Sequence, residues 1–389
     1  MNAHDFKPFG TFGIVKSREV LGSRPVLRGW EECVAKAQAR SIYSHPDWVL
    51  SSCDNKESLI YLRPHRGEQD GALECLAVLR PNPVHLGRRA FLAWLLSLNG
   101  FKLVGDQLLG ETDRASTGVF LSDLLVWLNS GATEAECIFF EDIEIDSPLW
   151  NCLEEVREQG SAILFQPSPP QVHWWIQFSD PPTAYWNRFS GKTWSDVRSK
   201  ARKLRHSVVC FTRSDQVPEF LAKAHEVSKQ SWQAKRLGLR IQNSPEERQF
   251  FEFLAAHGVM RCYILEQDGK PLAFEFGYQW NGCFVFEETG YDLAYAQYSP
   301  GMVLIFRVLE DLTSRDTPSL CDFGSGDAPY KQFWGTRQTS SGPVLLVRRG
   351  KRTLTVLGLQ KLGRSLGRSA LAALKKVRLA SYARRIYRK

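Results

Sequence analysis

The sequence has no long hydrophobic run, no paired-cysteine motif and no acidic residue near its end. Its longest apolar stretch, near residues 91–96, is far shorter than the roughly 20 residues that a membrane-spanning helix needs. The nine cysteines are scattered, none falls in a Cys-x-x-Cys pair, and the eight histidines do not cluster near them. These absences argue against a disulfide framework and a structural zinc site, so we expect reduced thiols and no metal. The first residues show no basic stretch followed by an apolar one, which predicts a cytoplasmic protein without a secretory signal.

The overall composition is that of an ordinary globular protein. Hydrophobic residues make up 43% of the 389 residues and charged residues 24%, which excludes a wholly disordered chain and a collagen. At about 150 residues for a typical domain, this length predicts two or three domains that can each bury a core.

The basic charge of the chain is confined to its end. Residues 348–389 carry fourteen Lys and Arg and no Asp or Glu, whereas the other 347 residues carry 36 basic and 42 acidic residues. The net charge of +8 therefore comes from this end segment, which argues against a DNA-binding protein. The segment would be attracted to an anionic membrane surface or to RNA phosphates, and a disordered tail that does neither is the third alternative.

Strand and helix patterns divide the rest of the chain into two halves. Strands and helices alternate up to residue 165, and the proline-rich stretch PSPPQ at residues 167–171 then interrupts them. After this stretch the alternation restarts. We expect an α+β fold with two domains, residues 1–166 and 172–346, followed by a basic tail, residues 348–389, that is helical from residue 369.

The second half contains a strong hairpin signal. The pairs Asp268-Gly269 and Asn281-Gly282 separate three runs of β-forming residues, which predicts a three-stranded antiparallel meander over residues 260–291. A helix over residues 302–314 and a short strand over residues 320–323 follow.

The order of motifs in this half resembles a known family. The meander is followed by YDLAYAQYSPG (residues 291–301), an apolar helix MVLIFRVLEDL and the segment CDFGSGDAPYKQFWG. With the basic helix RSKARKLRH and the hairpin GKPLAFEFG, this order is similar to GNAT-type acyltransferases of the BioF2-like and CelD group. That group occurs with bacterial exopolysaccharide and cellulose genes and is distantly related to the FemABX peptidyltransferases. The resemblance covers residues 182–334, and it implies two tandem GNAT-like domains, each a mixed sheet flanked by helices, of which the first is degenerate.

The YSPG element lies between a predicted strand and a predicted helix. Ser299 is expected to be the helix N-cap and Pro300 suits the first turn, while Gly301 would let a ligand approach the backbone. Free N–H groups and the positive dipole end at a helix start favour an anion. In GNAT enzymes the equivalent turn holds the pyrophosphate of acyl-CoA, so the resemblance implies that acyl-CoA contacts Tyr298, Ser299, Gly301 and Met302.

Glutamates of the meander are candidates for the base that deprotonates an attacking amine. Glu287 and Glu288 are adjacent on the last strand, where side-chain alternation is expected to place them on opposite faces. Glu288 shares its face with apolar residues that would raise its pKa toward a useful value, so we favour Glu288. Glu287 and Glu275, which lies on the neighbouring strand, stay open as alternatives, as does a purely ion-paired role.

The segment GSGDAPYK, residues 324–331, follows the last predicted strand. Asp327 is a candidate for binding an amine or hydroxyl of the acceptor, and Lys331 for stabilising the oxyanion of a tetrahedral intermediate. The resemblance supports the second role, because FemABX relatives carry a lysine in a similar pair that is thought to act in this way. The alternative is a loop cap with a surface ion pair.

Three functional hypotheses follow from these features. The first is an acyl-CoA-dependent acyltransferase, with acetyl-CoA or another acyl-CoA as co-substrate, acting on a sugar, polysaccharide or cell-envelope precursor. The second is a FemABX-like transferase that uses aminoacyl-tRNA, with RNA bound by residues 348–389. The third is a non-catalytic scaffold of exopolysaccharide assembly that the basic tail holds at the inner face of the cell membrane. The acceptor, the acyl group and the oligomeric state stay open in all three.

Overall fold

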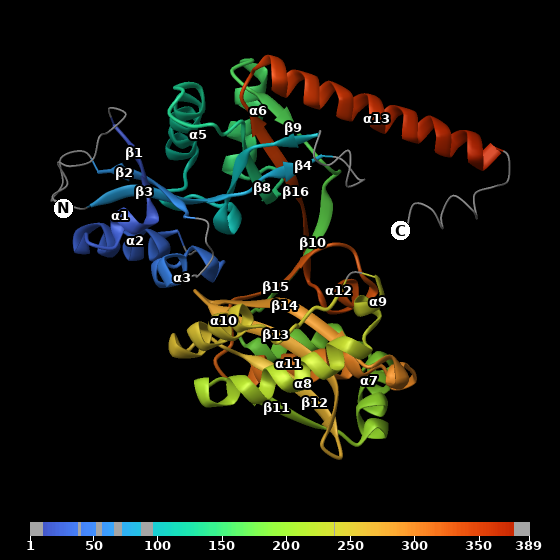
Figure 1. The fold of residues 1–389 in the computed structure, drawn as a ribbon. Helices are drawn as coiled ribbons and strands as arrows, with labels where there is room; N and C mark the ends of the chain where they lie inside the picture. Colours follow the sequence, from blue (N-terminus) through green and yellow to red (C-terminus); the bar gives the residue numbers. More distant parts are fainter. Residues whose placement is uncertain are drawn as a thin grey trace. The chain divides into compact units, whose positions relative to one another are not determined.

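The computed structural model (Figure 1) describes residues 11–37, 40–51, 57–65, 72–86, 96–236 and 238–376. None of the helices described there has both the length and the apolar character that crossing a membrane requires. The eight cysteines within these residues are free thiols, and seven of them are buried.

The chain forms two compact units, and each unit joins segments that are distant in the sequence. The first comprises Met1–Gly29, Lys56–Pro169 and Gly342–Lys389, and the second comprises Trp30–Asn55 and Pro170–Ser341. The division after Pro169 falls inside the proline-rich stretch at which the sequence divides. Two features differ from the sequence-based scheme, because residues 30–55 join the second unit and the end of the chain joins the first.

The first unit is a sheet with flanking helices. Its strand order is β1, β2, β3, β6, β8 and the second half of β16, and β6 and β8 are parallel neighbours. Helices α5 and α6 pack on one face over an apolar core. The bounds are β1 Gly13–Lys16, α1 Ser17–Val20, α2 Arg24–Lys36, β2 Leu59–Pro64, β3 Leu73–Pro81, β4 Val84–His85, β5 Ser97–Leu98, β6 Gly100–Leu103, η3 Val104–Asp106, β7 Leu109–Gly110, α5 Arg114–Asn129, β8 Cys137–Glu144, α6 Pro148–Glu158, β9 Ile163–Phe165, β16 Arg337–Val347 and α13 Lys351–Lys376. Helix α2 passes from the first unit into the second at Trp30.

The second unit is built on an antiparallel sheet with one parallel pair. Its strand order is the first half of β16, then β10, β15, β14, β13, β12 and β11, and among the described strands of this unit only β14 and β15 pair in parallel. The bounds are η2 Ile42–Ser44, α3 Pro46–Ser51, β10 Gln171–Gln177, η4 Pro182–Arg188, α7 Gly191–Leu204, β11 Ser207–Phe211, η5 Ser214–Gln216, α8 Val217–Gln230, α9 Trp232–Arg236, α10 Pro245–Ala256, β12 Cys262–Gln267, β13 Lys270–Trp280, β14 Cys283–Tyr291, η6 Leu293–Tyr298, α11 Pro300–Ser314, β15 Leu320–Ser325 and α12 Pro329–Trp334.

Strands β12, β13 and β14 form the meander that the sequence predicts. The two central residues of each turn have positive φ, with values of 50° and 80° at Asp268 and Gly269 and of 45° and 72° at Asn281 and Gly282. Asn and Gly tolerate this conformation, and it matches the right-handed twist of the flanking strands. The hairpin prediction is therefore confirmed.

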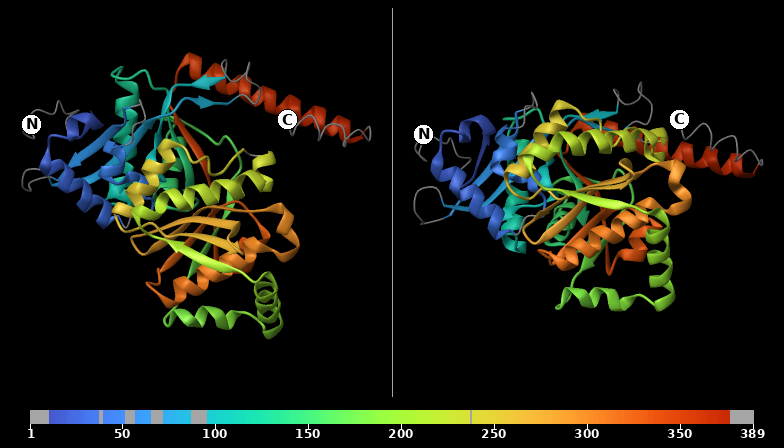
Figure 2. Two further views of the ribbon diagram at one scale, coloured as in Figure 1. Left: turned by 60° about the horizontal axis from the view of Figure 1, so that its bottom comes forward. Right: turned by 90° about the horizontal axis from the view of Figure 1, so that it is seen from below.

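Helices cover both faces of this sheet. Helices α8 and α10 pack on one face over a core that includes Phe274, Phe276 and Tyr278. Helices α7 and α11 pack on the other face over a core that includes Tyr263 and Ala273. The right-hand view in Figure 2 shows the yellow-green α8 and the orange α11 on opposite sides of the strands. We call these the α8 face and the α11 face.

The helix at the end of the chain differs from its prediction. The sequence predicts a helix from residue 369, whereas α13 already begins at Lys351 and extends to Lys376. Its first turns are buried at Val356 and Leu357 in an apolar cluster of the first unit. The glycines at 358, 363 and 367 do not interrupt it, because packing of one helix face outweighs the modest propensity cost of each glycine. Residues 377–389 lie outside the described part of the chain.

Candidate functional site

The parallel pair β14–β15 opens toward its carboxyl end. Only Cys283, Phe284 and Val285 of β14 pair with β15, although β14 continues to Tyr291 and β15 to Ser325. No further pairing joins these two strands in the part of the chain that the structure describes. Helix α11 connects them, so the open end of the pair, the start of α11 and the residues after β15 share one edge of the sheet.

The start of α11 presents backbone N–H groups at this edge. The first intrahelical bond is donated by the N–H of Val303 to the carbonyl of Ser299, at 3.1 Å. The N–H groups of Gly301 and Met302 precede it, and no described residue accepts a hydrogen bond from either. Two free N–H groups at the positive end of a fifteen-residue helix favour an anion.

The predicted cap of α11 is only partly correct. Ser299 occupies the N-cap position, but its backbone is left-handed (φ 52°, ψ 52°) and its side chain makes no capping hydrogen bond. A Cβ on Gly301 would lie 3.3 Å from Cδ1 of Tyr291, so this glycine allows the end of β14 to approach the helix. Met302 is half-buried against the α11-face core, and Tyr298 is 37% exposed. The four residues expected to contact acyl-CoA therefore surround the helix start.

Lys331 lies at the same edge and is almost fully buried. Its ammonium group donates to the carbonyl oxygens of Gly324 and Ser325, at 3.1 and 2.8 Å. These carbonyls end β15, and Gly324 has a φ of 70° that permits the turn toward α12. The ammonium is thus held at the carboxyl end of the strand that forms one side of the open pair.

Asp327 lies in the turn between β15 and α12, and its side chain is exposed. It accepts hydrogen bonds from Nε1 of Trp174, at 3.2 Å, and from Nε2 of Gln332, at 2.8 Å. These contacts fix the carboxylate beside the half-buried ring of Trp174. An exposed carboxylate at this position fits the acceptor-binding role that the sequence suggests.

A β-bulge changes the expected geometry of the two adjacent glutamates. Phe276 pairs with Glu288, but the next residue of β13, Gly277, pairs with Phe286, so Glu287 is the extra residue of β14. Glu287 accepts a hydrogen bond from the hydroxyl of Tyr43, at 2.9 Å. Glu288 forms an ion pair with Arg240 that includes a 2.8 Å bond from Nε.

Both glutamates therefore belong to the α8 face rather than to opposite faces. Phe276, the partner of Glu288, is part of the α8-face core, and Tyr43 packs against the same core. The structure does not bring Glu288 together with Lys331, and its carboxylate is neutralised by a guanidinium instead of being surrounded by apolar groups. The bulge explains the difference, because it breaks the alternation on which the expectation rested.

Glu275 is the glutamate that shares a face with Lys331. Its side chain is fully buried, and neither carboxyl oxygen has a hydrogen-bond partner within normal limits among the described residues. Burial raises the pKa of Glu275 well above its ordinary value, while the Thr289 hydroxyl and the Lys331 ammonium act in the opposite direction. Thr289 lies directly across from it on β14. Burial and the nearby Glu275 carboxylate also raise the pKa of the Tyr330 hydroxyl.

Sequence reasoning left Glu275 open as a third candidate, although a signal was present. The acid lies inside the apolar strand segment PLAFEFG, where a charged side chain is costly unless it has a role. What the sequence lacks is the pairing with Thr289 and the position of Lys331, which come from residues 14 and 56 positions further along the chain.

A buried polar chain on β10, β15 and β16 was not found from the sequence. His173 contacts Oδ1 of Asp322 through Nε2, at 2.5 Å, and Oγ of Ser341 through Nδ1, at 3.3 Å. Its ring stacks on Trp175 with centroids 4.3 Å apart. The three residues come from three neighbouring strands, and β10 precedes β15 and β16 by more than a hundred residues of sequence, so only the fold brings His173 to the other two.

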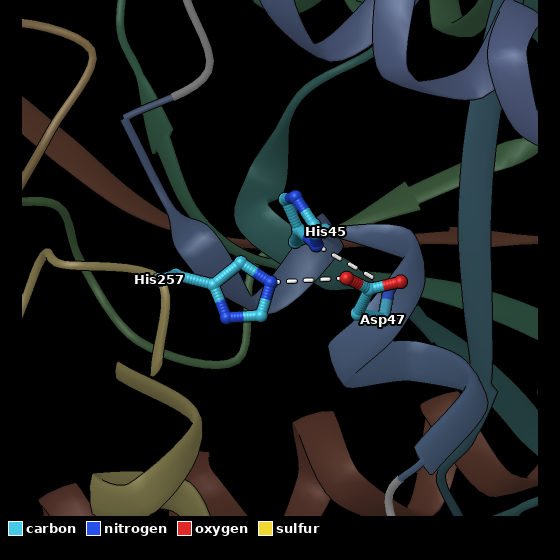
Figure 3. A group of neighbouring side chains, drawn as sticks. All are labelled: His45, Asp47 and His257. Carbon is cyan, nitrogen blue, oxygen red and sulfur yellow. Dashed lines mark hydrogen bonds and ion pairs between the residues drawn. The ribbon is translucent and has the colours of Figure 1, made fainter. Parts of the chain in front are cut away.

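Figure 3 shows a group of possible metal ligands at the end of α10. His45, Asp47 and His257 offer ligand atoms within 4.8 Å of one another. Nε2 of His257 contacts Oδ2 of Asp47 at 3.0 Å, and its Nδ1 contacts the carbonyl of Phe253 at 2.9 Å. The backbone N–H of Asp47 donates to Nδ1 of His45 at 3.3 Å. These bonds explain why the three side chains lie together, because they link the start of α3 to the end of α10. A negative charge is favoured at the start of a helix and a positive charge at its end.

The comparisons with known proteins agree with this geometry. Residues 191–332 match the family of the acetyltransferase (GNAT) domain. No curated protein matches the chain. Among solved structures, the chain is similar to FemX, with a TM-score of 0.53 and 11% identity over 75% of this chain and 88% of FemX. It is also similar to a tandem GNAT protein from the clavulanic acid biosynthesis pathway, with a TM-score of 0.48 and 12% identity over 87% of this chain and 99% of that one. A further similar structure is L-PGS from Bacillus licheniformis, with a TM-score of 0.48 and 12% identity over 88% of this chain and 97% of that one.

The domain match covers α7 through α12, and therefore the open strand pair, the start of α11 and Lys331. The likeness to FemX shows that the α+β fold is shared with that protein. Residues 191–332 of the second unit therefore match the acetyltransferase (GNAT) domain, and this match supports an acyltransferase.

Proposed function

We propose that the protein transfers an acyl group from acyl-CoA, such as acetyl-CoA, to an amine or hydroxyl of a sugar, polysaccharide or cell-envelope precursor. The choice of acyl-CoA as the donor rests on the start of α11, which lies at the open end of β14 and β15. The free N–H groups of Gly301 and Met302 suit the pyrophosphate of CoA. The open strand pair leaves strand-edge backbone groups for the amide-containing arm of the same molecule.

The reaction we propose is direct attack in a ternary complex. The acceptor nitrogen or oxygen attacks the thioester carbonyl, its proton passes to a base, and CoA leaves as a thiolate that takes up a proton. Holding both substrates in one site removes much of the entropic barrier. The Lys331 ammonium, fixed at the carboxyl end of β15, is positioned to stabilise the oxyanion that forms on the carbonyl.

For the base we propose Glu275 in place of Glu288. Glu275 lies on the face that Lys331 occupies, and burial raises its pKa well above the ordinary value, which makes its carboxylate a stronger base. Because its side chain is fully buried, proton exchange with the acceptor would pass through a neighbouring polar group such as the Thr289 hydroxyl. Glu288 is paired with Arg240 on the α8 face, which favours a structural role.

The acceptor class rests on the sequence resemblance and on the surface around the site. The resemblance to the BioF2-like and CelD group supports a sugar or envelope precursor. Trp232 of α9 is 39% exposed, and the next residue, Gln233, donates to the carbonyl of Thr289 at 2.9 Å. An exposed aromatic ring is thus held beside the outer half of β14, where it offers an apolar surface to the acceptor.

Calorimetric titration with acetyl-CoA tests the donor assignment. Gly301→Asp and Met302→Glu each place a negative charge at the start of α11, and we expect both to weaken binding at least about tenfold. Gly191→Asp is the matched control, because it adds the same charge at the start of α7, where a Cβ meets no atom within 4 Å. Wild-type protein that gives neither heat nor a thermal shift with any acyl-CoA would contradict the proposal.

A second candidate is aminoacyl transfer from aminoacyl-tRNA. The FemABX resemblance, the fold shared with FemX and the basic end segment favour it. It predicts tRNA binding that weakens steeply with salt and is lost on deletion of residues 364–389, which carry nine of the fourteen basic residues and leave the buried Val356 and Leu357 of α13 in place. Binding that is insensitive to this deletion would remove the candidate.

A further inference from the structure

The first turns of α13 are anchored to the first unit by one face. Thr353, Val356, Leu357 and Gln360 are buried, and Val356 and Leu357 belong to the apolar cluster that β5, β9 and β16 form. Nε2 of Gln360 donates to the carbonyl of Leu86 at 2.8 Å. Because these residues recur at helical spacing, the orientation of α13 about its own axis is fixed.

The opposite face of these turns is apolar and exposed. Leu354, Leu359 and Leu362 are 57%, 44% and 57% exposed. They project within an arc of about 140° around the helix. Among the residues whose side chains the structure describes, eight large apolar ones are exposed, and these leucines are three of them. The concentration of exposed leucine on one short helix segment indicates a surface that is covered by another apolar phase.

The charge beside this leucine arc is entirely basic. Lys351 and Lys361 are exposed and project within about 60° of Leu354. No acidic residue occurs from residue 348 to the end of the chain, whereas basic residues continue through the rest of α13 and beyond it. A leucine arc flanked by cations suits a surface that is anionic outside and apolar beneath.

We propose that α13 docks the protein onto an anionic lipid bilayer. In this arrangement Leu354, Leu359 and Leu362 enter the boundary between headgroups and acyl chains, and the lysines and arginines contact lipid phosphates. A bilayer fits better than RNA, because RNA phosphates attract the cations but offer no apolar phase, and leucine has no aromatic face on which bases stack. The inference is independent of the acyl donor and the acceptor.

Sedimentation of the full chain with vesicles tests this inference. We expect binding to phosphatidylcholine vesicles that contain phosphatidylglycerol, at least about tenfold stronger than to phosphatidylcholine alone, and weakened by salt. A triple variant, Leu354→Ser with Leu359→Ser and Leu362→Ser, should lose at least about tenfold of the affinity for the anionic vesicles.

The matched control is the double variant Leu21→Ser with Val126→Ser, which removes two apolar side chains of the same unit that are 56% and 52% exposed. It should bind vesicles like wild type, and melting curves show whether each variant is folded. Poly(U) RNA is the competing polyanion, and the triple variant should bind it as wild type does. Equal vesicle binding by the triple variant and wild type, or equal binding to neutral and anionic vesicles, would overturn the inference.

Discussion

Glu275 shows how a single residue can be conspicuous in a sequence and still be assigned only by the structure. An acid among Phe274, Phe276 and Ala273 is unusual in a central strand, and the sequence alone marks it as a candidate. The choice of Glu275 over Glu288 as the base depends on the bulge at Glu287, which no turn residue or hydrophobic pattern in the sequence indicates. Single-residue roles on a strand could therefore be predicted only as a set of alternatives.

The buried carboxyl of Glu275 makes stability depend on pH. In the unfolded chain a glutamate ionises at its ordinary pKa of about 4.3, whereas burial raises the pKa of Glu275 in the folded protein. Between these two pKa values the folded state binds the additional proton, so the free energy of unfolding falls as the pH rises. Glu275→Gln removes this titration, and we expect the variant to melt above wild type at neutral pH, with the difference shrinking toward about pH 4.

The same variant separates a catalytic Glu275 from a merely buried one. If Glu275 accepts the acceptor proton, Glu275→Gln should lower kcat by about 100-fold to 10,000-fold while it raises the melting temperature. Glu252→Gln, at an exposed position of α10, is the control and should change neither quantity. A variant that is stabilised and fully active would remove Glu275 from the mechanism.

Lys331 is the second residue whose role can be tested by itself. Lys331→Met keeps the length of the buried stem but removes the ammonium that contacts the carbonyls of Gly324 and Ser325. If the ammonium stabilises the oxyanion, kcat should fall by about 100-fold to 1,000-fold, and the Kd of acyl-CoA should stay nearly unchanged. Lys192→Met, at an exposed position of α7, is the control. Equal loss of binding and of turnover would indicate a structural role instead.

At the scale of elements, local signals were sufficient wherever the chain specifies its own turns and caps. The hairpin turns follow from the Asp-Gly and Asn-Gly pairs, and Ser244 is the N-cap of α10 and forms a capping box with Glu247. Local sequence signals failed where tertiary contacts determine the backbone conformation. Ser299 has a capping residue type, but its backbone is left-handed and its side chain makes no capping hydrogen bond.

At the scale of the whole molecule, the tandem α+β architecture could be predicted from the sequence, whereas its connectivity could not. The proline-rich stretch marks one division, and the repeated strand–helix pattern indicates two similar halves. Nothing local shows that residues 30–55 join the second unit or that residues after 341 return to the first. Such exchanges depend on long-range burial, for example of Val356 and Leu357, whose pattern in the sequence equals that of a free amphipathic helix.

The return of the chain end to the first unit predicts that two truncations of the basic segment differ in stability. Deletion of residues 348–389 removes the buried Val356 and Leu357 and the ion pair between Arg352 and Glu136. At about 1.5–3 kcal/mol for each buried aliphatic side chain, it should lower the free energy of unfolding by about 3–6 kcal/mol. Deletion of residues 364–389 removes none of these contacts, so it should change that free energy by less than about 0.5 kcal/mol. Urea unfolding followed by circular dichroism measures both, and equal stability of the two truncations would mean that the start of α13 does not complete the first core.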